Sequence, residues 1–191
     1  MKIKDVRVHH LRKKLSSPMR ISRGGFTFRE HAIIEVITDV GITGLGEGVG
    51  DAPMVKAIVE GVLGDEVKGL DPLDINGIRE KLLDGKVYFE RKGSVICAAS
   101  AIETACWDIL GKEKNVPLYQ LLGGLVRDKV EVYASDVYWD KDPRTMAENA
   151  ERIAKKGIKT IKVHLGCLPP EEEVEHVKVL REVLGVDISL M

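Results

Sequence analysis

The chain has 191 residues, which suits one or two domains, and 44% of them are hydrophobic, enough to form a buried core. Its formal net charge of -1 excludes a general attraction to nucleic acid or to an acidic membrane surface. No continuous apolar stretch approaches the roughly 20 residues of a membrane span, and the three cysteines lack a metal-type spacing. We therefore expect a cytoplasmic protein with reduced thiols and with neither nucleic-acid nor membrane partners.

The N-terminal part has the pattern of β-strands. Residues 2–11 read as an extended, charged strand, and residues 31–39 are rich in β-branched side chains. Glycines in 41–48 mark turns around a third, short strand. These features predict a three-stranded antiparallel meander. The intervening stretch 16–28 contains a proline, two adjacent glycines and two arginines, which predicts a flexible loop.

Helical periodicity replaces the strand pattern after Pro53. Apolar residues recur at helical spacing up to Lys92, and 94–112 is the clearest helix, with small residues on a broad face that permit close packing. The glycines of 44–48 lack the following helix that a dinucleotide site needs, so we reject that interpretation. Residues 1–125 thus read as an α+β domain.

From residue 126 onward strands and helices alternate, which predicts a parallel sheet. The expected elements are strand 130–135, helix 143–156, strand 158–165, helix 169–184 and the start of a strand in 187–191. We interpret 126–191 as the first two and a half βα units of an incomplete barrel of the TIM type, which closes with roughly 250 residues. We expect the open sheet edge to associate with a second copy of the chain or with a complementary barrel half.

The strand within GIKTIKVHLG (157–166) has two contrasting faces. One face is apolar and consists of Ile161, Val163 and Leu165. The other carries Lys162 and His164 near the carboxyl end of the strand, where the active sites of such barrels lie. A lysine or a histidine in this place is able to act as a general base. A solvated amphipathic strand, or a lysine paired for structure alone, would give the same pattern.

Four stretches, in this order, resemble the mandelate racemase and muconate lactonizing enzyme branch of the enolase superfamily. TDVGITGLGEGV is similar to the family's N-terminal meander, and AASAIETACWDILGKEKNVPLYQLLGG is similar to the long helix and the hinge before its barrel. GIKTIKVHLG falls where the family carries Lys-x-Lys, and PEEEVEHVKVLREVLGVDISLM is similar to the helix that leads to its first metal-binding carboxylate. The resemblance extends over nearly the whole chain.

The resemblance implies an α+β domain that caps a (β/α) barrel and an enzyme that removes the proton α to a carboxylate. It implies that the substrate binds Mg2+ held by three acids on later strands, none of which lies in this chain. Racemisation, epimerisation, cycloisomerisation or dehydration would follow. Two capping-domain loops, matched by 16–28 and 48–54, would shape the substrate pocket. Arg20 and Arg23 would then meet an anionic substrate, unless they are ordinary surface arginines, and Ser135 would lie near it.

One departure from the family concerns the base. Lys162 matches the first lysine of Lys-x-Lys, whereas His164 stands in place of the second lysine, which usually acts as the base. His164 would either take over as base or only hold the substrate. A different class of function stays open, in which the chain is a non-catalytic fragment or one half of a split protein.

Overall fold

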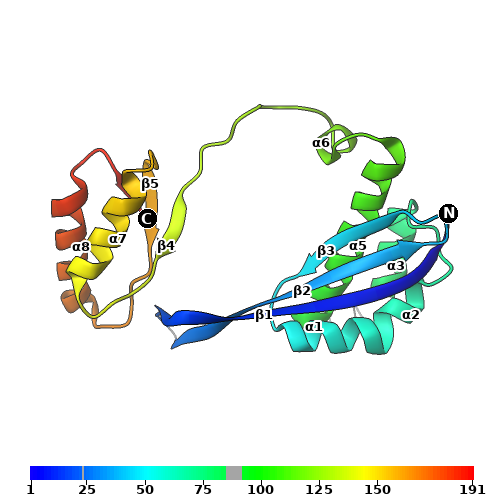
Figure 1. Ribbon diagram of the computed structural model, residues 1–191, viewed down its shortest axis with the longest axis horizontal. Helices are drawn as coiled ribbons and strands as arrows, with labels where there is room; N and C mark the ends of the chain where they lie inside the picture. The colour runs from blue at the N-terminus through cyan, green and yellow to red at the C-terminus, as the bar shows by residue number, and fades with distance from the viewer. Residues whose placement is uncertain (23, 85–91) are drawn as a thin grey trace. The chain divides into compact units, whose positions relative to one another are not determined.

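The computed structural model describes residues 1–22, 24–84 and 92–191. These residues form two compact units, which we describe in turn (Figure 1). The first unit comprises residues 1–13 and 29–126, and the second comprises residues 14–28 and 127–191. Residues 14–28 therefore group with the C-terminal part of the chain. The boundary between 125 and 126 that we expected from the sequence stays a prediction.

Three strands form the predicted meander, in the order β1-β2-β3. They are β1 (Ile3–Ile21), β2 (Gly24–Thr38) and β3 (Thr43–Gly48). Strands β2 and β3 are antiparallel, with Ala32 opposite Gly48 and Ile37 opposite Thr43. Alternate residues of β2, such as Ile34, are fully buried because side chains alternate between the two faces of a strand.

The flexible loop that we predicted for 16–28 is wrong, because β1 continues to Ile21 and β2 begins at Gly24. Proline is tolerated here because β1 is an edge strand. The glycines serve the hairpin itself: Gly24 has a φ of 124°, and a Cβ on Gly25 would lie 2.6 Å from the Met19 carbonyl oxygen. Glycine thus allows the turn and the close approach of the two strands.

Helices follow the meander. They are α1 (Ala52–Ile58), the π-helical η1 (Val59–Leu63), α2 (Gly64–Val67), α3 (Ile75–Leu83), α5 (Ser94–Lys114) and α6 (Leu118–Leu121). Asp51 caps α1 by accepting the Met54 amide at 2.9 Å, and Asp74 caps α3 by accepting the Gly77 amide at 3.1 Å. Helices within 52–67 and 75–83 and the long helix from 94 follow the predicted helical spacing, whereas residues 85–91 of the predicted stretch 53–92 lie outside the described residues.

Helix α5 packs directly on β3 (Figure 1). A Cβ on Gly44 would lie 2.0 Å from the carbonyl oxygen of Ala105, and one on Gly46 would lie 2.0 Å from that of Ala101. The glycines of 44–48 therefore serve helix–strand packing. By length and composition α5 is the one helix among the described residues that could cross a membrane, but core helices pass the same test. Its face toward the core, including Ile102 and Ile109, is fully buried.

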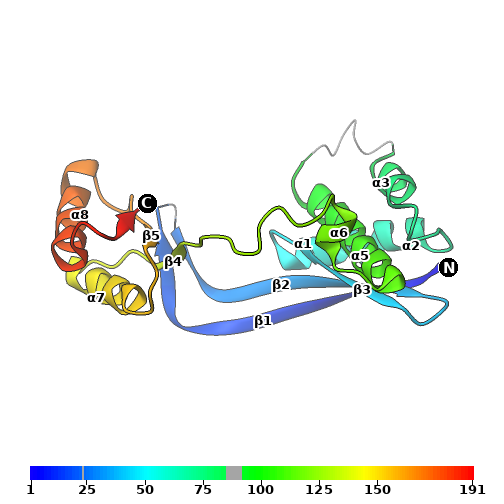
Figure 2. The ribbon, with the colours of Figure 1, turned by 90° about the horizontal axis from the view of Figure 1, so that it is seen from above.

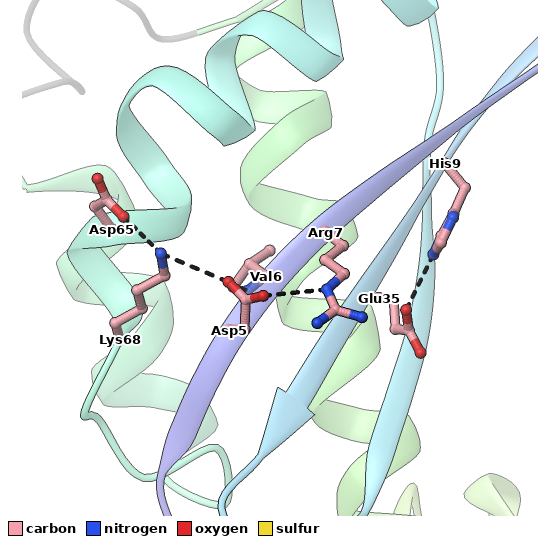
Figure 3. A network of polar contacts seen from close by, with 7 residues as sticks. All are labelled: Asp5, Val6, Arg7, His9, Glu35, Asp65 and Lys68. Carbon is pink, nitrogen blue, oxygen red and sulfur yellow. Dashed lines mark hydrogen bonds and ion pairs between the residues drawn. The ribbon is translucent and has the colours of Figure 1, made fainter.

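Surface ion pairs connect β1 to the end of α2 (Figure 3). The Asp5 carboxylate lies 3.1 Å from Arg7 Nε and 3.6 Å from Lys68 Nζ, and Lys68 also contacts Asp65 at 2.8 Å. Exposed pairs of this kind are screened by solvent and add little to stability. They orient the edge strand, whereas the apolar core supplies most of the stability of this unit.

The second unit contains a parallel three-stranded sheet in the order β4-β5-β6, with two helices packed on one side of it (Figures 1 and 2). Its elements are β4 (Ala134–Val137), α7 (Pro143–Ala154), β5 (Thr160–Val163), α8 (Pro170–Leu184) and β6 (Ser189–Leu190). This is the predicted β-α-β-α-β order. The expected strand 130–135 is displaced to 134–137, because pairing with β5 starts at Ala134 and the alternating residues before it, such as Val130, are exposed.

Replacing Gly46 by alanine tests the contact between β3 and α5. We expect Gly46→Ala to lower the free energy of unfolding by about 1–3 kcal/mol or more, because the new methyl group overlaps the Ala101 carbonyl oxygen. The control is Gly61→Ala, where nothing lies within 4 Å of an added Cβ and helical propensity predicts a gain of about 0.5–1 kcal/mol. Denaturant unfolding measures both, and equal effects would contradict the packing argument.

The thiols should differ in reactivity. Burial, reinforced by Glu103, raises the pKa of Cys106 to about 12, whereas Cys167 is exposed. Relative to an ordinary thiol, Cys106 therefore has about a thousandfold less thiolate at a given pH below 9. We expect an alkylating reagent at pH 8 to modify Cys167 in the native protein and Cys106 only after unfolding, as peptide mass spectrometry would show. Rapid native modification of Cys106 would contradict its burial.

Candidate functional site

The two faces of β5 divide as the alternation predicts. Ile161 is fully buried, and Val163 and Leu165 pack against the core that β5 shares with α7 and α8. Lys162 and His164 alternate with these residues and are half-buried on the other face. The fold thus gives one side of β5 to the core and leaves the other for a lysine and a histidine.

Two neighbours fix the His164 ring. Its Nδ1 lies 3.2 Å from the carbonyl oxygen of Val137, and its backbone N–H donates to the same oxygen at 2.9 Å. The ring also stacks on Tyr138, with centroids 4.6 Å apart and planes 7° apart, and Phe26 meets the edge of Tyr138 at 6.0 Å. A carbonyl oxygen only accepts, so Nδ1 carries the proton and Nε2 keeps a lone pair. Neutral His164 is therefore held in the tautomer that can accept a proton at Nε2.

Lys162 and Ser135 belong to adjacent strands. Ala134 pairs with Ile161 and Val137 with Val163, so Ser135 and Asp136 together stand opposite the single residue Lys162. Such a two-to-one arrangement is a β-bulge, a feature common beside active sites. Ser135 is exposed, and no hydrogen bond or ion pair joins the side chains of Lys162, His164 and Ser135 to one another within the described part of the chain.

The structure places Arg20 beside the loop that follows β4. The Arg20 carbonyl oxygen accepts the Trp139 amide at 3.3 Å, and its guanidinium lies 5.9 Å from the centre of the Trp139 ring, within cation–π range. Arg23, the other arginine that we expected to meet the substrate, lies outside the described residues. The second expected pocket loop, 48–54, contains the Asp51 cap of α1, which already has a structural partner.

Glu173 and His176 on α8 form a buried polar pair that our sequence interpretation missed. They are only 6% and 4% exposed. Glu173 Oε1 accepts the N–H groups of Gly166, Cys167 and Leu168 at 2.8–2.9 Å. Burial alone would raise the pKa of Glu173, but these hydrogen bonds and nearby His176 outweigh it, so the pKa lies below the ordinary value of 4.5.

A sequence signal for this pair existed. Glu173 and His176 recur at the helical spacing of the buried Leu180 and Leu184, so they lie on the apolar stripe of α8. The exposed Glu171 and Glu172 suit the positive end of the helix dipole, so the run 171–173 does not by itself set Glu173 apart. The stacking of Tyr138 on His164 had no comparable signal, because it depends on how the end of β4 lies beside the end of β5.

The described residues offer a base and cations but no metal centre. His164 supplies a proton acceptor, and Lys162 and Arg20 supply positive charge on the second unit. No group of three or more His, Cys, Asp or Glu side chains in residues 1–22, 24–84 and 92–191 could hold a metal ion. The second unit thus places a lysine and a histidine at the carboxyl end of a strand in a parallel sheet, where the active sites of barrel enzymes lie.

Comparison with known proteins identifies the family. The sequence profile of the mandelate racemase / muconate lactonizing enzyme N-terminal domain matches residues 3–123. The chain belongs to this family, within the enolase superfamily, and corresponds to the N-terminal part of its members. Both the suspected family and the fold class, a capping domain followed by the start of a barrel, are confirmed.

Individual relatives have several activities. The chain is 32% identical to the N-succinyl-L-Arg/Lys racemase of Bacillus cereus, covering 100% of this chain and 51% of the racemase. It is also 32% identical to the arabinonate dehydratase of Saccharolobus solfataricus, over 98% of this chain and 52% of that enzyme. The crystal structure of the dipeptide epimerase of Enterococcus faecalis with Mg and the dipeptide L-Leu-L-Tyr superimposes with a TM-score of 0.84 at 32% identity, over 100% and 52% of the two chains. The chain thus spans about half the length of these relatives.

The geometry predicts opposite tautomers for two histidines. His164 should carry its proton on Nδ1, facing the Val137 carbonyl, whereas His176 should carry it on Nε2, which lies 3.0 Å from the Asp140 carbonyl oxygen. Long-range 1H–15N correlation spectra of the imidazole rings at neutral pH distinguish the two forms, with His164→Asn and His176→Asn assigning the signals. The same tautomer at both positions would contradict the arrangement of one of these rings.

Proposed function

We propose that the chain is the N-terminal part of an enzyme that removes the proton α to a carboxylate, as a racemase, epimerase, dehydratase or cycloisomerase. The observation that carries the proposal is the fixed His164 ring, with Nδ1 bonded to Val137 and Nε2 able to accept a proton. The relatives, which include a racemase, an epimerase, a dehydratase and a cycloisomerase, support this set of reactions.

In this proposal His164 is the base. A substrate whose α-hydrogen faces Nε2 would transfer that proton to the ring, forming an imidazolium whose Nδ1–H still donates to the Val137 carbonyl. Stacking on Tyr138 and the two bonds to Val137 hold the ring in one orientation, so little reorganisation is needed. His164 would thereby replace the second lysine of the family's motif.

Positive side chains would bind the anion. Lys162 lies on β5, two residues before His164, and would stabilise the negative charge that develops as the proton leaves. Arg20, over the Trp139 ring, and Ser135, on the adjacent strand, would contact the more distant polar groups of the substrate. We therefore propose a small carboxylate, such as an acid sugar or an acylated amino acid, as the substrate class.

We propose that the complete enzyme uses Mg2+, held by residues other than those described here. The dipeptide epimerase was crystallised with Mg, which supports Mg2+ in the complete enzyme. However, the described part of this chain offers no set of three ligands. We therefore assign no step of the reaction to a metal here.

The three free thiols are compatible with the cytoplasmic location that we propose.

Replacement of Lys162 and His164 tests the proposal. The substitutions are made in the native protein as its source produces it. We expect His164→Asn and Lys162→Ala each to slow exchange of the substrate α-proton with solvent by about a hundredfold or more. Lys159→Ala is the matched control, because this lysine is exposed before β5, and it should leave exchange unchanged. Proton NMR in deuterium oxide follows the exchange, and circular dichroism checks the fold.

Retention of exchange by both His164→Asn and Lys162→Ala would overturn the roles proposed for them. Exposed apolar side chains on and after α8, including Val174, Val177 and Val186, favour the alternative of a half that associates with a partner or with itself. Intact mass spectrometry and size-exclusion chromatography of the native protein separate the two possibilities. A 21.1 kDa chain that is active only with a second chain would support the split protein.

A further inference from the structure

Glu173 gathers three successive amides around one oxygen. The N–H groups of Gly166, Cys167 and Leu168 point at Oε1, at 2.9, 2.8 and 2.9 Å. Consecutive amides that converge in this way make an anion-binding concavity, here filled by the chain's own carboxylate. The other oxygen, Oε2, is buried and has no hydrogen-bond partner in the described part of the chain. The three amides therefore provide the main stabilisation of the charge.

The loop that Glu173 holds contacts the end of the β1–β2 hairpin. The Cys167 thiol donates to the Ile21 carbonyl oxygen at 3.4 Å. Gly166 has a φ of 96°, and a Cβ on it would lie 3.0 Å from Ser22 Cβ, so the two backbones approach closely. Gly166 also lies two residues after His164, which connects the same loop to the proposed base.

His176, one turn further along α8, serves the neighbouring loop. Its Nε2 donates to the Asp140 carbonyl oxygen at 3.0 Å, and its ring stacks near Trp139 with centroids 6.0 Å apart. Trp139 in turn donates its amide to Arg20. Two side chains of a single helix thus contact the loops after both β4 and β5, and each loop contacts residues 20–22.

We propose that Glu173 is a positioning residue, which holds residues 166–168 and through them the hairpin end with Arg20 beside the substrate. This proposal rests on the proposed function for its effect on catalysis, but not for its effect on the loop. Glu173 touches no reacting atom. Its loss should loosen the contacts of Cys167 and Gly166 with residues 21 and 22, and therefore weaken substrate binding more than the proton-transfer step.

Two substitutions on the first turn of α8 give a matched test. Glu173→Ala removes the acceptor, and Glu172→Ala removes an exposed carboxylate of equal charge from the same turn. Hydrogen–deuterium exchange, followed by NMR, should show the amides of 166–168 exchanging about tenfold faster or more in Glu173→Ala. Glu172→Ala should leave the exchange of these amides unchanged. The Ile78 amide in the other unit should exchange at the same rate in both variants as in the unaltered protein. Glu173→Gln keeps an acceptor oxygen and should restore part of the protection.

The pH dependence gives a second readout. Groups near the Glu173 carboxylate are His176 on its own helix and Cys167 on the loop, with Arg20 of β1 near Cys167. Because its pKa is lowered in the folded protein, the carboxylate contributes stability above pH 4.5, and that contribution is lost as the pH falls through the lower folded value. The amides of 166–168 should therefore stay protected at pH 4.5 and lose protection in more acidic solution, and this step should be absent in Glu173→Gln.

Kinetics of the active protein complete the test. Glu173→Ala should raise KM about tenfold or more while kcat changes by less than about threefold, because the substrate contacts move and the base stays in place. Unchanged exchange of the 166–168 amides would overturn the proposal outright. Faster exchange with an unchanged KM would overturn the link to substrate. If His164→Asn kept its activity while the amides still responded to Glu173, the loop role would stand and the assignment of the base would fail.

Discussion

The close approach of β3 to α5 is the constraint on which the first unit depends. The carbonyl oxygens of Ala101 and Ala105 occupy space that any side chain on Gly46 or Gly44 would need. With the helix seated this closely, the small residues of α5 and the buried face of β2 enclose one continuous core. The glycines of 44–48, whose spacing looks like a nucleotide-binding motif, thus serve the packing of β3 on α5.

The sequence predicts the regular elements well and the irregular contacts poorly. Periodicity identified the meander, the long α5 helix and the alternating strands and helices, because burial on one face imposes a pattern on the residues. The segment 16–28 failed because its proline and glycines are as compatible with an edge hairpin as with a loop. The predicted start of β4 was wrong because the residues around Val132 alternate like a strand but are exposed, and the pairing with β5 begins only at Ala134.

The candidate site, too, could be predicted from the sequence only in part. Lys162 and His164 followed from alternation along one strand and from a motif, both of which are local. The Val137 carbonyl and Tyr138, which fix the His164 ring, lie at the end of β4 and just after it. Their relation to the ring depends on the register across the bulge. A structural role for Glu173 could have been predicted, because a charged residue on the buried stripe of a helix requires a partner. Its partners are backbone amides, which no residue type reveals.

Strands β1 and β2 each run without interruption from one compact unit into the other. Side chains alternate along both strands, so inserting or deleting one residue near the unit boundary would exchange the two faces for every residue beyond it. The core positions of the first unit and the contacts of residues 20–22 in the second cannot both survive such a change. An insertion or deletion in this hairpin is therefore expected to involve two residues in each strand, so that the alternation of both strands is kept. The alternation of side chains along the hairpin is thus a constraint on both units at once.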